Sequence, residues 1–453
     1  MRIIQIVICL QLVAFLIACN KKGYLDTKPS TSVFMPNTPE DLQGLLDNPT
    51  VFGFGPYLNT ISADEFFYSD HFIDDQSSEA KAYTWQDKIF SDKEEVWDWN
   101  GFYTQIYYCN IALEGVEKGL SNKVLINQYN LVRGDAYFKR AIAFYNLAQS
   151  FCRPYDTVTS DTDLGVPIRL TTDNQETLSR GTVKATYDQI ISDLNKAIPL
   201  LPDKLNNKFR NRGSQPAAWA MLARTYLSMR DYQEAAQAAE QSRNLYDSLI
   251  NFYELDPNIP IPFSPTNKET LYQMKMPAGN FIPAFLNGAA YINTNLISLY
   301  APEDLRKTFF FSKSTPYIKS SFNGEIYPFC GLAIDEVYLI LAESYIKLGQ
   351  TALGIDVLNK LMITRWQKNK YFPYSESNAD KARLIVLTER QKELLFRGQR
   401  WSDIRRLNKE GFKIDLIRTL NGTTYNLKYN EFDKFVLPLP GSVLAFGYKP
   451  NPR

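Results

Sequence analysis

The chain has 453 residues, of which 45% are hydrophobic and 14% are aromatic. Its 50 Lys and Arg residues are balanced by 49 Asp and Glu residues, so no basic excess would attract nucleic acid. The single histidine, His71, is too few for a multi-histidine metal site, and the sequence has neither a Walker loop nor a dinucleotide-binding glycine motif. We therefore expect no metal ion, no cofactor and no nucleic-acid partner, and the length suggests roughly two or three domains.

A lipoprotein signal is predicted at the start of the chain. A positively charged start is followed by an apolar run over residues 3–18, which ends in small residues directly before Cys19. This order is typical of a secretory signal, and the run is shorter than the roughly 20 residues of a membrane-spanning helix. A cysteine at the first mature position is the group that receives the lipid in bacterial lipoproteins. We expect removal of residues 1–18 and lipidation of Cys19; a plain secretory signal is the alternative.

The first long irregular segment covers residues 48–88, where proline and glycine interrupt any helical pattern. Recognition sites are common in such loops on rigid scaffolds. A surface that binds sugars or peptides needs flat aromatic faces together with a few polar groups. This segment offers Asp64, Phe67, Tyr68, His71, Asp74 and Trp85 as candidate ligand-binding residues.

Helix pairs with tetratricopeptide-like spacing repeat along the chain. In the clearest copy, Leu222, Ala223 and Tyr226 share one helical face, and a second helix follows a short turn. Copies are expected at 219–235, at 338–358, at 137–144 with 187–202 around a polar loop at 151–180, and more weakly at 94–118. Stacked pairs of this kind form a superhelix. We predict a mainly α fold, a tetratricopeptide-like helical-repeat superhelix with long irregular loop insertions.

A second irregular segment, rich in proline and glycine, covers residues 248–325. It adds Phe281, Phe285, Asn287 and Tyr291 to the candidate ligand-binding residues, just before a helix-like stretch at 293–300. Four tryptophans at helical spacing are instead assigned to the core: Trp97, Trp99, Trp219 and Trp401.

Three cysteines remain after Cys19, namely Cys109, Cys152 and Cys330. An odd number does not make a disulfide framework. One pair could form a bridge in an oxidising compartment, and buried free thiols are the alternative.

A charged motif near the C-terminus admits two interpretations. Glu389, Glu393 and Arg397 are spaced four residues apart, so on one helix they could pair along one face. Arg400, Asp403 and Arg406 extend the charged set, with Trp401 packing beneath. Two carboxylates could indicate a glycosidase. Beside so many arginines they are better explained as ionised members of structural ion pairs, so we expect no catalytic residues.

Five stretches together resemble the SusD/RagB family of outer-membrane nutrient-binding lipoproteins. They are residues 19–29, residues 133–141 with 164–167, residues 335–365, residues 389–406, and residues 436–440 with 451–452. The stretch at 389–406 is the most specific, and the resemblance covers nearly the whole chain. One departure is Gly134-Asp135, where the family usually has Ala-Glu.

The resemblance implies a cell-surface protein that captures an oligosaccharide or a peptide and delivers it to a SusC-like TonB-dependent β-barrel transporter. It also implies a lipid anchor in the outer membrane and a ligand site built from loops on the face away from the repeats. We expect three parts: a signal peptide at 1–18, a region of repeats and loop insertions at 19–247, and a C-terminal region at 248–453 with the second ligand loop, the last repeat and the closing motifs.

Two other functions stay open at this point. A tetratricopeptide scaffold in the outer membrane would bind only proteins, and a hydrolase would act on glycans. The aromatic-rich insertions favour ligand binding over a pure scaffold. The residues alone do not distinguish a glycan from a peptide.

Overall fold

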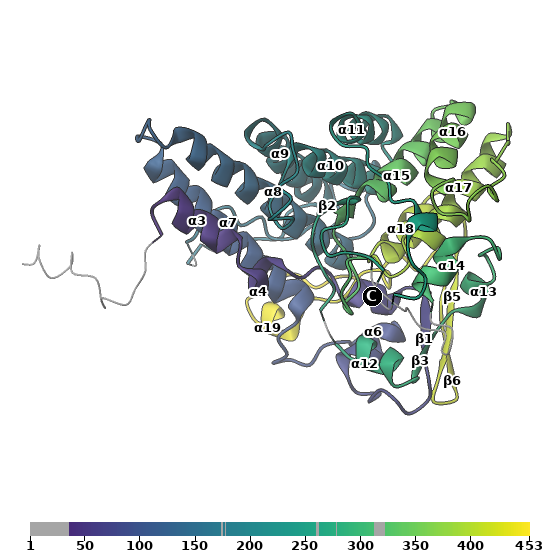
Figure 1. Cartoon of the computed structure of the whole chain (residues 1–453). Helices are drawn as coiled ribbons and strands as arrows, with labels where there is room; N and C mark the ends of the chain where they lie inside the picture. Colours follow the sequence, from purple (N-terminus) through teal and green to yellow (C-terminus); the bar gives the residue numbers. More distant parts are fainter. Residues whose placement is uncertain (1–35, 174, 177, 260–261, 278, 312–321) are drawn as a thin grey trace, which may run out of the picture.

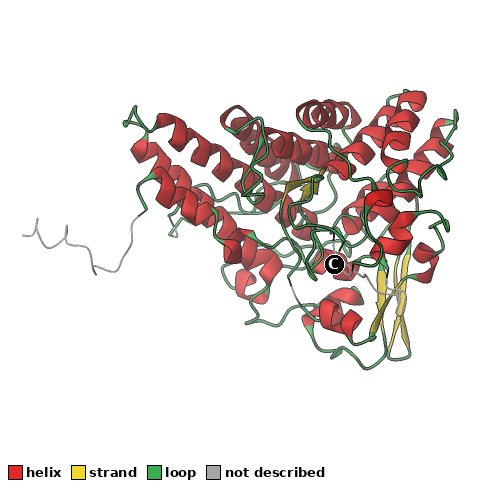
Figure 2. Cartoon of the chain, in the orientation of Figure 1, coloured by secondary structure: helices red, strands yellow, loops and turns green. Residues whose placement is uncertain are grey.

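The computed structural model describes residues 36–173, 175–176, 178–259, 262–277, 279–311 and 322–453 (Figure 1). The predicted signal peptide, Cys19 and the motif at 19–29 lie outside these residues. Helices dominate the described part of the chain, and its strands are short (Figure 2).

A layer of helices forms one side of the molecule, along the top of Figure 1. In chain order they are α7 (Trp97–Gly119), α8 (Ile126–Phe151), α9 (Val183–Ala197), α10 (Gln215–Met229), α11 (Tyr232–Leu245), α15 (Ile334–Lys347), α16 (Thr351–Met362) and α17 (Ala379–Glu393). Packing joins α7 to α8, α8 to α9, α10 to α11, α11 to α15, and α15 to α16. Each helix thus buries a face against the next, and the predicted mainly α, tetratricopeptide-like fold is confirmed.

Local sequence sets the ends of these helices. The Ser214 hydroxyl accepts the N–H of Ala217 at the start of α10, and the Asp231 carboxylate accepts the N–H of Glu234 at the start of α11. Between the two helices Arg230 adopts a left-handed conformation with φ of 65° and ends α10. The second helix can therefore turn back directly onto the first.

Shorter elements lie mainly on the other side of this layer, toward the bottom of Figure 1. They are α3 (Pro39–Leu46), α4 (Pro49–Phe52), α5 (Leu58–Ser62), α6 (Ser78–Tyr83), η1 (Ile198–Leu200), η2 (Phe252–Glu254), α12 (Phe281–Leu286), α13 (Thr294–Ile297), α14 (Leu305–Phe310), α18 (Arg400–Asn408) and α19 (Gly441–Leu444). The two segments predicted as irregular therefore contain short helices. The helix expected at 293–300 is limited to Thr294–Ile297.

Three antiparallel two-stranded sheets connect these segments. β1 (Phe66–Tyr68) pairs with β3 (Ala290–Ile292), β2 (Thr270–Tyr272) with β4 (Leu332–Ala333), and β5 (Leu416–Leu420) with β6 (Thr423–Leu427). The first sheet joins the first irregular segment to the second, although more than 200 residues separate their strands.

The main core lies between the helical layer and the irregular segments. Phe138 of α8 meets Tyr272 of β2 edge-on, with ring centroids 4.9 Å apart. Cys109, Cys152 and Cys330 are all free and buried, as one of the two alternatives predicted. Burial raises the pKa of Cys152 to about 11, so its thiol stays protonated and unreactive at neutral pH.

Close packing of α15 against α16 requires glycine at position 354. A Cβ atom there would lie 2.7 Å from the backbone carbonyl oxygen of Ala342 and 2.6 Å from Cγ1 of Ile346. Because a backbone oxygen cannot move aside, we expect Gly354→Ala to lower the free energy of unfolding by about 1–3 kcal/mol. Urea unfolding of the variant and the wild type measures this difference.

Gly44 provides the matched control for this prediction. It also lies within a helix, α3, but nothing lies within 4 Å of the position that its Cβ would take. Gly44→Ala should therefore stabilise the protein by about 0.5–1 kcal/mol through helix propensity. Equal effects of the two substitutions would contradict the packing argument.

Candidate functional site

Pairing of β1 with β3 brings two of the predicted ligand residues together. Phe67 faces Tyr291 directly across the two strands, with ring centroids 5.7 Å apart and planes tilted by 34°. Because side chains alternate along a strand, the flanking residues point inward while these two rings point outward. Tyr291 is 41% exposed and Phe67 is half-buried. We call this pair of rings the aromatic ribbon.

Four other predicted ligand residues are buried: Tyr68, Trp85, Phe281 and Phe285. Phe281 and Phe285 pack around Phe66, with ring centroids 5.0 and 5.8 Å from it. The indole of Trp85 donates to the carbonyl of Ser62 at 3.0 Å, and the Tyr68 hydroxyl donates to Glu79. Tyr68, Phe281 and Phe285 pack in the main core with Phe66, Trp85 packs in a separate cluster with Trp401, and all four present almost no surface to a ligand.

Three predicted ligand residues are exposed, namely His71, Asp74 and Asn287. Asn287 ends α12 and lies close in sequence to Tyr291 on the aromatic ribbon. The Asp74 carboxylate accepts the N–H of Gln76 at 3.0 Å and so shapes its own turn. His71 has φ of 61°, an uncommon conformation for a non-glycine residue.

Asn421, at the tip of the β5–β6 hairpin, holds this loop in place and was missed by the sequence analysis. Its amide oxygen accepts the backbone N–H of His71 at 2.6 Å. Its own backbone N–H and side-chain amide donate to Asp70 and Asp75, each at 2.6 Å. The following Gly422 makes an Asn-Gly pair, which is a hairpin signal that could have been found.

Asp64 is already paired with a cation. Arg400 donates two hydrogen bonds to its carboxylate, at 2.7 and 2.8 Å. Burial alone would raise the pKa of Asp64, but the charge and hydrogen bonds of Arg400 outweigh burial and hold that pKa below its usual value. Asp64 thus joins the first irregular segment to α18. The ligand-binding role of all ten candidates stays a prediction.

The tryptophans assigned to the core differ in burial. Trp99 and Trp401 are 6% and 1% exposed, whereas Trp97 and Trp219 are only half-buried. The core assignment therefore holds in full for two of the four.

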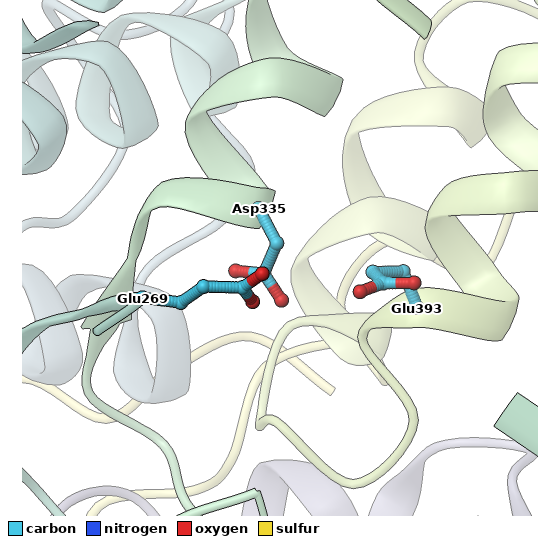
Figure 3. A group of neighbouring side chains, drawn as sticks. All are labelled: Glu269, Asp335 and Glu393. Atoms are coloured by element: carbon cyan, nitrogen blue, oxygen red, sulfur yellow. The ribbon is translucent and has the colours of Figure 1, made fainter. Parts of the chain in front are cut away.

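Three buried carboxylates lie close together (Figure 3). They belong to Glu269, Asp335 and Glu393, and one oxygen from each lies within 4.8 Å of the other two. Arg365 donates to Glu269 at 2.9 Å and to Glu393 at 2.7 Å, and Arg397 donates to Asp335 at 3.0 Å. Burial raises the pKa of Glu269, while the charge of Arg365 opposes that shift and favours the ionised carboxylate. The guanidinium groups of Arg365 and Arg397 bind all three carboxylates, so the negative charge of this cluster is balanced without a metal ion.

The pairing predicted along one helix face at 389–397 is wrong. α17 ends at Glu393, so Arg397 lies beyond the helix and binds Asp335 instead. Glu389 and Glu393 both accept from the buried Arg306, which is contributed by α14. Spacing alone suggested pairing with Arg397, whereas the actual partners are Lys392 of the same helix and the arginines Arg306 and Arg365 of other segments.

The second half of the motif does hold the C-terminal segment onto the repeats. Asp403 of α18 accepts from Arg390 of α17 at 2.8 Å and from Arg406 at 2.8 Å. Arg406 also donates to Glu343 of α15 at 2.7 Å. These carboxylates are occupied by arginine, which makes them structural groups in this geometry.

Two family models match the chain. A SusD-like model described as "Starch-binding associating with outer membrane" matches residues 23–227, and the SusD family model matches residues 319–438. The chain belongs to the SusD/RagB family, whose members are carbohydrate-binding proteins associated with the outer membrane.

Individual relatives agree with this assignment. The "SusD-like protein P2" of Formosa agariphila is 26% identical over 77% of this chain and 79% of its own length. The solved structure of a SusD superfamily protein from Bacteroides thetaiotaomicron has a TM-score of 0.74 at 21% identity, covering 92% of this chain and 100% of its own. A putative sugar-binding protein from Bacteroides vulgatus also has a TM-score of 0.74, at 22% identity, with 93% and 99% covered. These structures show the same fold.

Glu65, beside the aromatic ribbon, should make stability depend on pH. Its side chain accepts the N–H of Phe396 at 3.0 Å, and burial raises its pKa from 4.5 to about 8. The folded protein holds this proton more tightly than the unfolded chain does. The contribution of the protonated Glu65 to the free energy of unfolding is complete below about pH 4.5 and is lost as pH rises through 8. We expect Glu65→Gln to gain stability relative to the wild type between pH 5 and pH 9, as measured by urea unfolding.

Glu343 is the control for this pH effect. Burial alone would raise the pKa of Glu343, but the charge of Arg406 outweighs burial and lowers this pKa to about 2. The carboxylate therefore stays ionised between pH 5 and pH 9. Glu343→Gln should destabilise the protein by a similar amount at pH 5 and at pH 9. A pH-independent difference between Glu65→Gln and the wild type would refute the assignment of a raised pKa to Glu65.

Proposed function

We propose that this chain captures an oligosaccharide on the aromatic ribbon and its neighbouring loops, and delivers it to a SusC-like TonB-dependent transporter. The observation that carries the proposal is the outward-facing pair of the half-buried Phe67 and the exposed Tyr291, built from two segments that the sequence had indicated separately. Two outward-facing rings provide the flat apolar surface that a sugar ring needs, and Asn287 supplies a nearby polar group. Membership of a carbohydrate-binding family supports the ligand class.

The location follows from the family and from the predicted signal. We propose that Cys19 carries lipid chains that anchor the protein to the outer membrane, with the ligand-binding loops facing the cell surface. No described helix is long and apolar enough to cross a bilayer. We also keep the division of the mature chain between residues 247 and 248, which falls just after α11 ends at Leu245.

Binding without catalysis is the form of activity that the described residues support. The paired carboxylates of the C-terminal motif already have arginine partners. An ionised carboxylate in an ion pair is a poor general acid, which a glycosidase requires. We therefore propose that the protein releases no product from glycans or peptides.

Removing either ring of the aromatic ribbon should weaken ligand binding. We expect Phe67→Ala and Tyr291→Ala each to reduce affinity by about 1–3 kcal/mol, the range found for anchor residues in binding sites. The measurement is calorimetric titration with the oligosaccharide that binds best on a glycan array that includes maltooligosaccharides. Unchanged affinity in both variants would show that the site lies elsewhere.

Two controls separate binding from folding. Phe372 is 83% exposed in a loop after α16, so Phe372→Ala removes a comparable ring and should leave affinity unchanged. Trp85→Ala should instead destabilise the fold by about 3–5 kcal/mol, because the indole is buried. Melting temperatures distinguish these outcomes.

Cys19→Ala should release the protein from the membrane or leave its signal uncleaved. Anchoring by two or more acyl chains is stable and resists a salt wash, whereas one chain anchors only weakly. Cys9→Ala is the matched control, because that cysteine leaves with the signal peptide and should not alter anchoring. Recovery of the Cys19→Ala protein from washed outer membranes that lack the transporter would refute lipidation at this residue.

A further inference from the structure

A separate cavity of about 430 Å³ lies between α4, the loop before α10 and the segment that leads through β2. This volume is within the range of small-ligand pockets. Its walls include Phe54, Arg210, Gln273 and Lys275. None of these residues belongs to the aromatic ribbon.

Backbone hydrogen bonds join the walls of this cavity. The N–H of Lys275 donates to the carbonyl of Gly53 at 3.0 Å, and the N–H of Gly55 donates to the carbonyl of Lys275 at 2.9 Å. The N–H of Gln273 donates to the carbonyl of Arg210 at 2.7 Å. The cavity is therefore formed before any ligand arrives, which lowers the entropic cost of binding.

Arg210 carries a charge that the described residues leave unbalanced. Its side chain is only 8% exposed, and it donates to the carbonyl of Thr270 at 3.1 Å and to the amide oxygen of Asn207 at 3.2 Å, both neutral groups. No described carboxylate lies within ion-pair distance of it, and its Nε has no partner among the described residues. By contrast, Arg306 and Arg365 each contact at least two carboxylates.

The other charged groups of the cavity cancel each other. Lys275 pairs with Glu325 at 2.9 Å and lies over the ring of Phe54, 5.7 Å from its centroid. The lining thus has one net positive charge, on Arg210. A buried charge without a counterion is costly, so a ligand with one negative charge would be stabilised there.

We propose that this cavity binds a saccharide unit that bears a carboxylate, with the carboxylate beside Arg210. A carboxylate carries one negative charge and matches arginine geometry, whereas a phosphate monoester carries nearly two charges at neutral pH. Gln273, Thr50 and Thr266 line the cavity, and their amide and hydroxyl groups are of the kind that bind sugar hydroxyls. The saccharide part of this assignment rests on the proposed function.

The test compares two ligands that differ only in charge. Trigalacturonate and its carboxyl-reduced neutral counterpart are titrated into the full mature chain at low salt. We expect at least tenfold tighter binding of trigalacturonate, and a loss of that preference at high salt. Arg210→Gln should remove the preference and Arg210→Lys should retain part of it. Equal affinities for the two ligands, or a preference that survives Arg210→Gln, would overturn the proposal.

Further variants keep the result interpretable. Thr266 is exposed at the rim, so Thr266→Trp should block the cavity without disturbing the core and should weaken trigalacturonate binding even if Arg210→Gln fails to fold. Tighter binding of triglutamate than of trigalacturonate would also refute the saccharide assignment. Tyr291→Ala tests the proposed function separately. If this variant no longer binds neutral sugars on the aromatic ribbon, the preference of the Arg210 cavity for a charged ligand can still be measured.

Discussion

A network of buried ion pairs fixes the irregular half of this molecule against its helices. Arg365 binds Glu269, just before β2, and also Glu393 at the end of α17. Arg306 of α14 binds Glu393 as well, so one carboxylate receives two guanidinium groups. Removing one partner of a buried ion pair costs about 3–5 kcal/mol, whereas replacing the whole set with apolar side chains is often neutral. The network therefore determines which segments meet more than it adds to the total stability.

This network explains how two short strands can present the aromatic ribbon. The second irregular segment is held at Glu269 and again at Arg306, and β3 lies between these two points. The first segment is held from the other side, where Arg418 of β5 donates to the carbonyls of Ile61, Ala63 and Tyr83. Three-residue strands have little stability of their own. Fixing both segments through arginine allows β1 and β3 to pair with one defined register.

The repeats could be predicted from the sequence, but the arrangement of the aromatic ribbon only in part. A helical period repeats over many residues, which is why the pairs around Leu222 and Leu341 were found. Irregular segments have no such period, so nothing distinguished the buried Trp85 and Phe281 from the exposed Tyr291. The pairing of Glu389 with Arg306 was also out of reach, because the two residues lie on segments that meet only in the folded chain.

The burial of aromatic residues limits how strongly the aromatic ribbon can bind. The chain has 28 Tyr and 28 Phe residues, yet among those described only Tyr107, Tyr253, Tyr291, Phe372 and Phe446 are at least 40% exposed. Most of the aromatic content therefore serves the core, and where the two irregular segments meet the outward-facing rings are the exposed Tyr291 and the half-buried Phe67. Anchors of about 1–3 kcal/mol each give modest affinity once the entropic cost of binding is subtracted. Modest affinity would suit the proposed delivery of the ligand to a transporter, because the release of a ligand slows as its binding tightens.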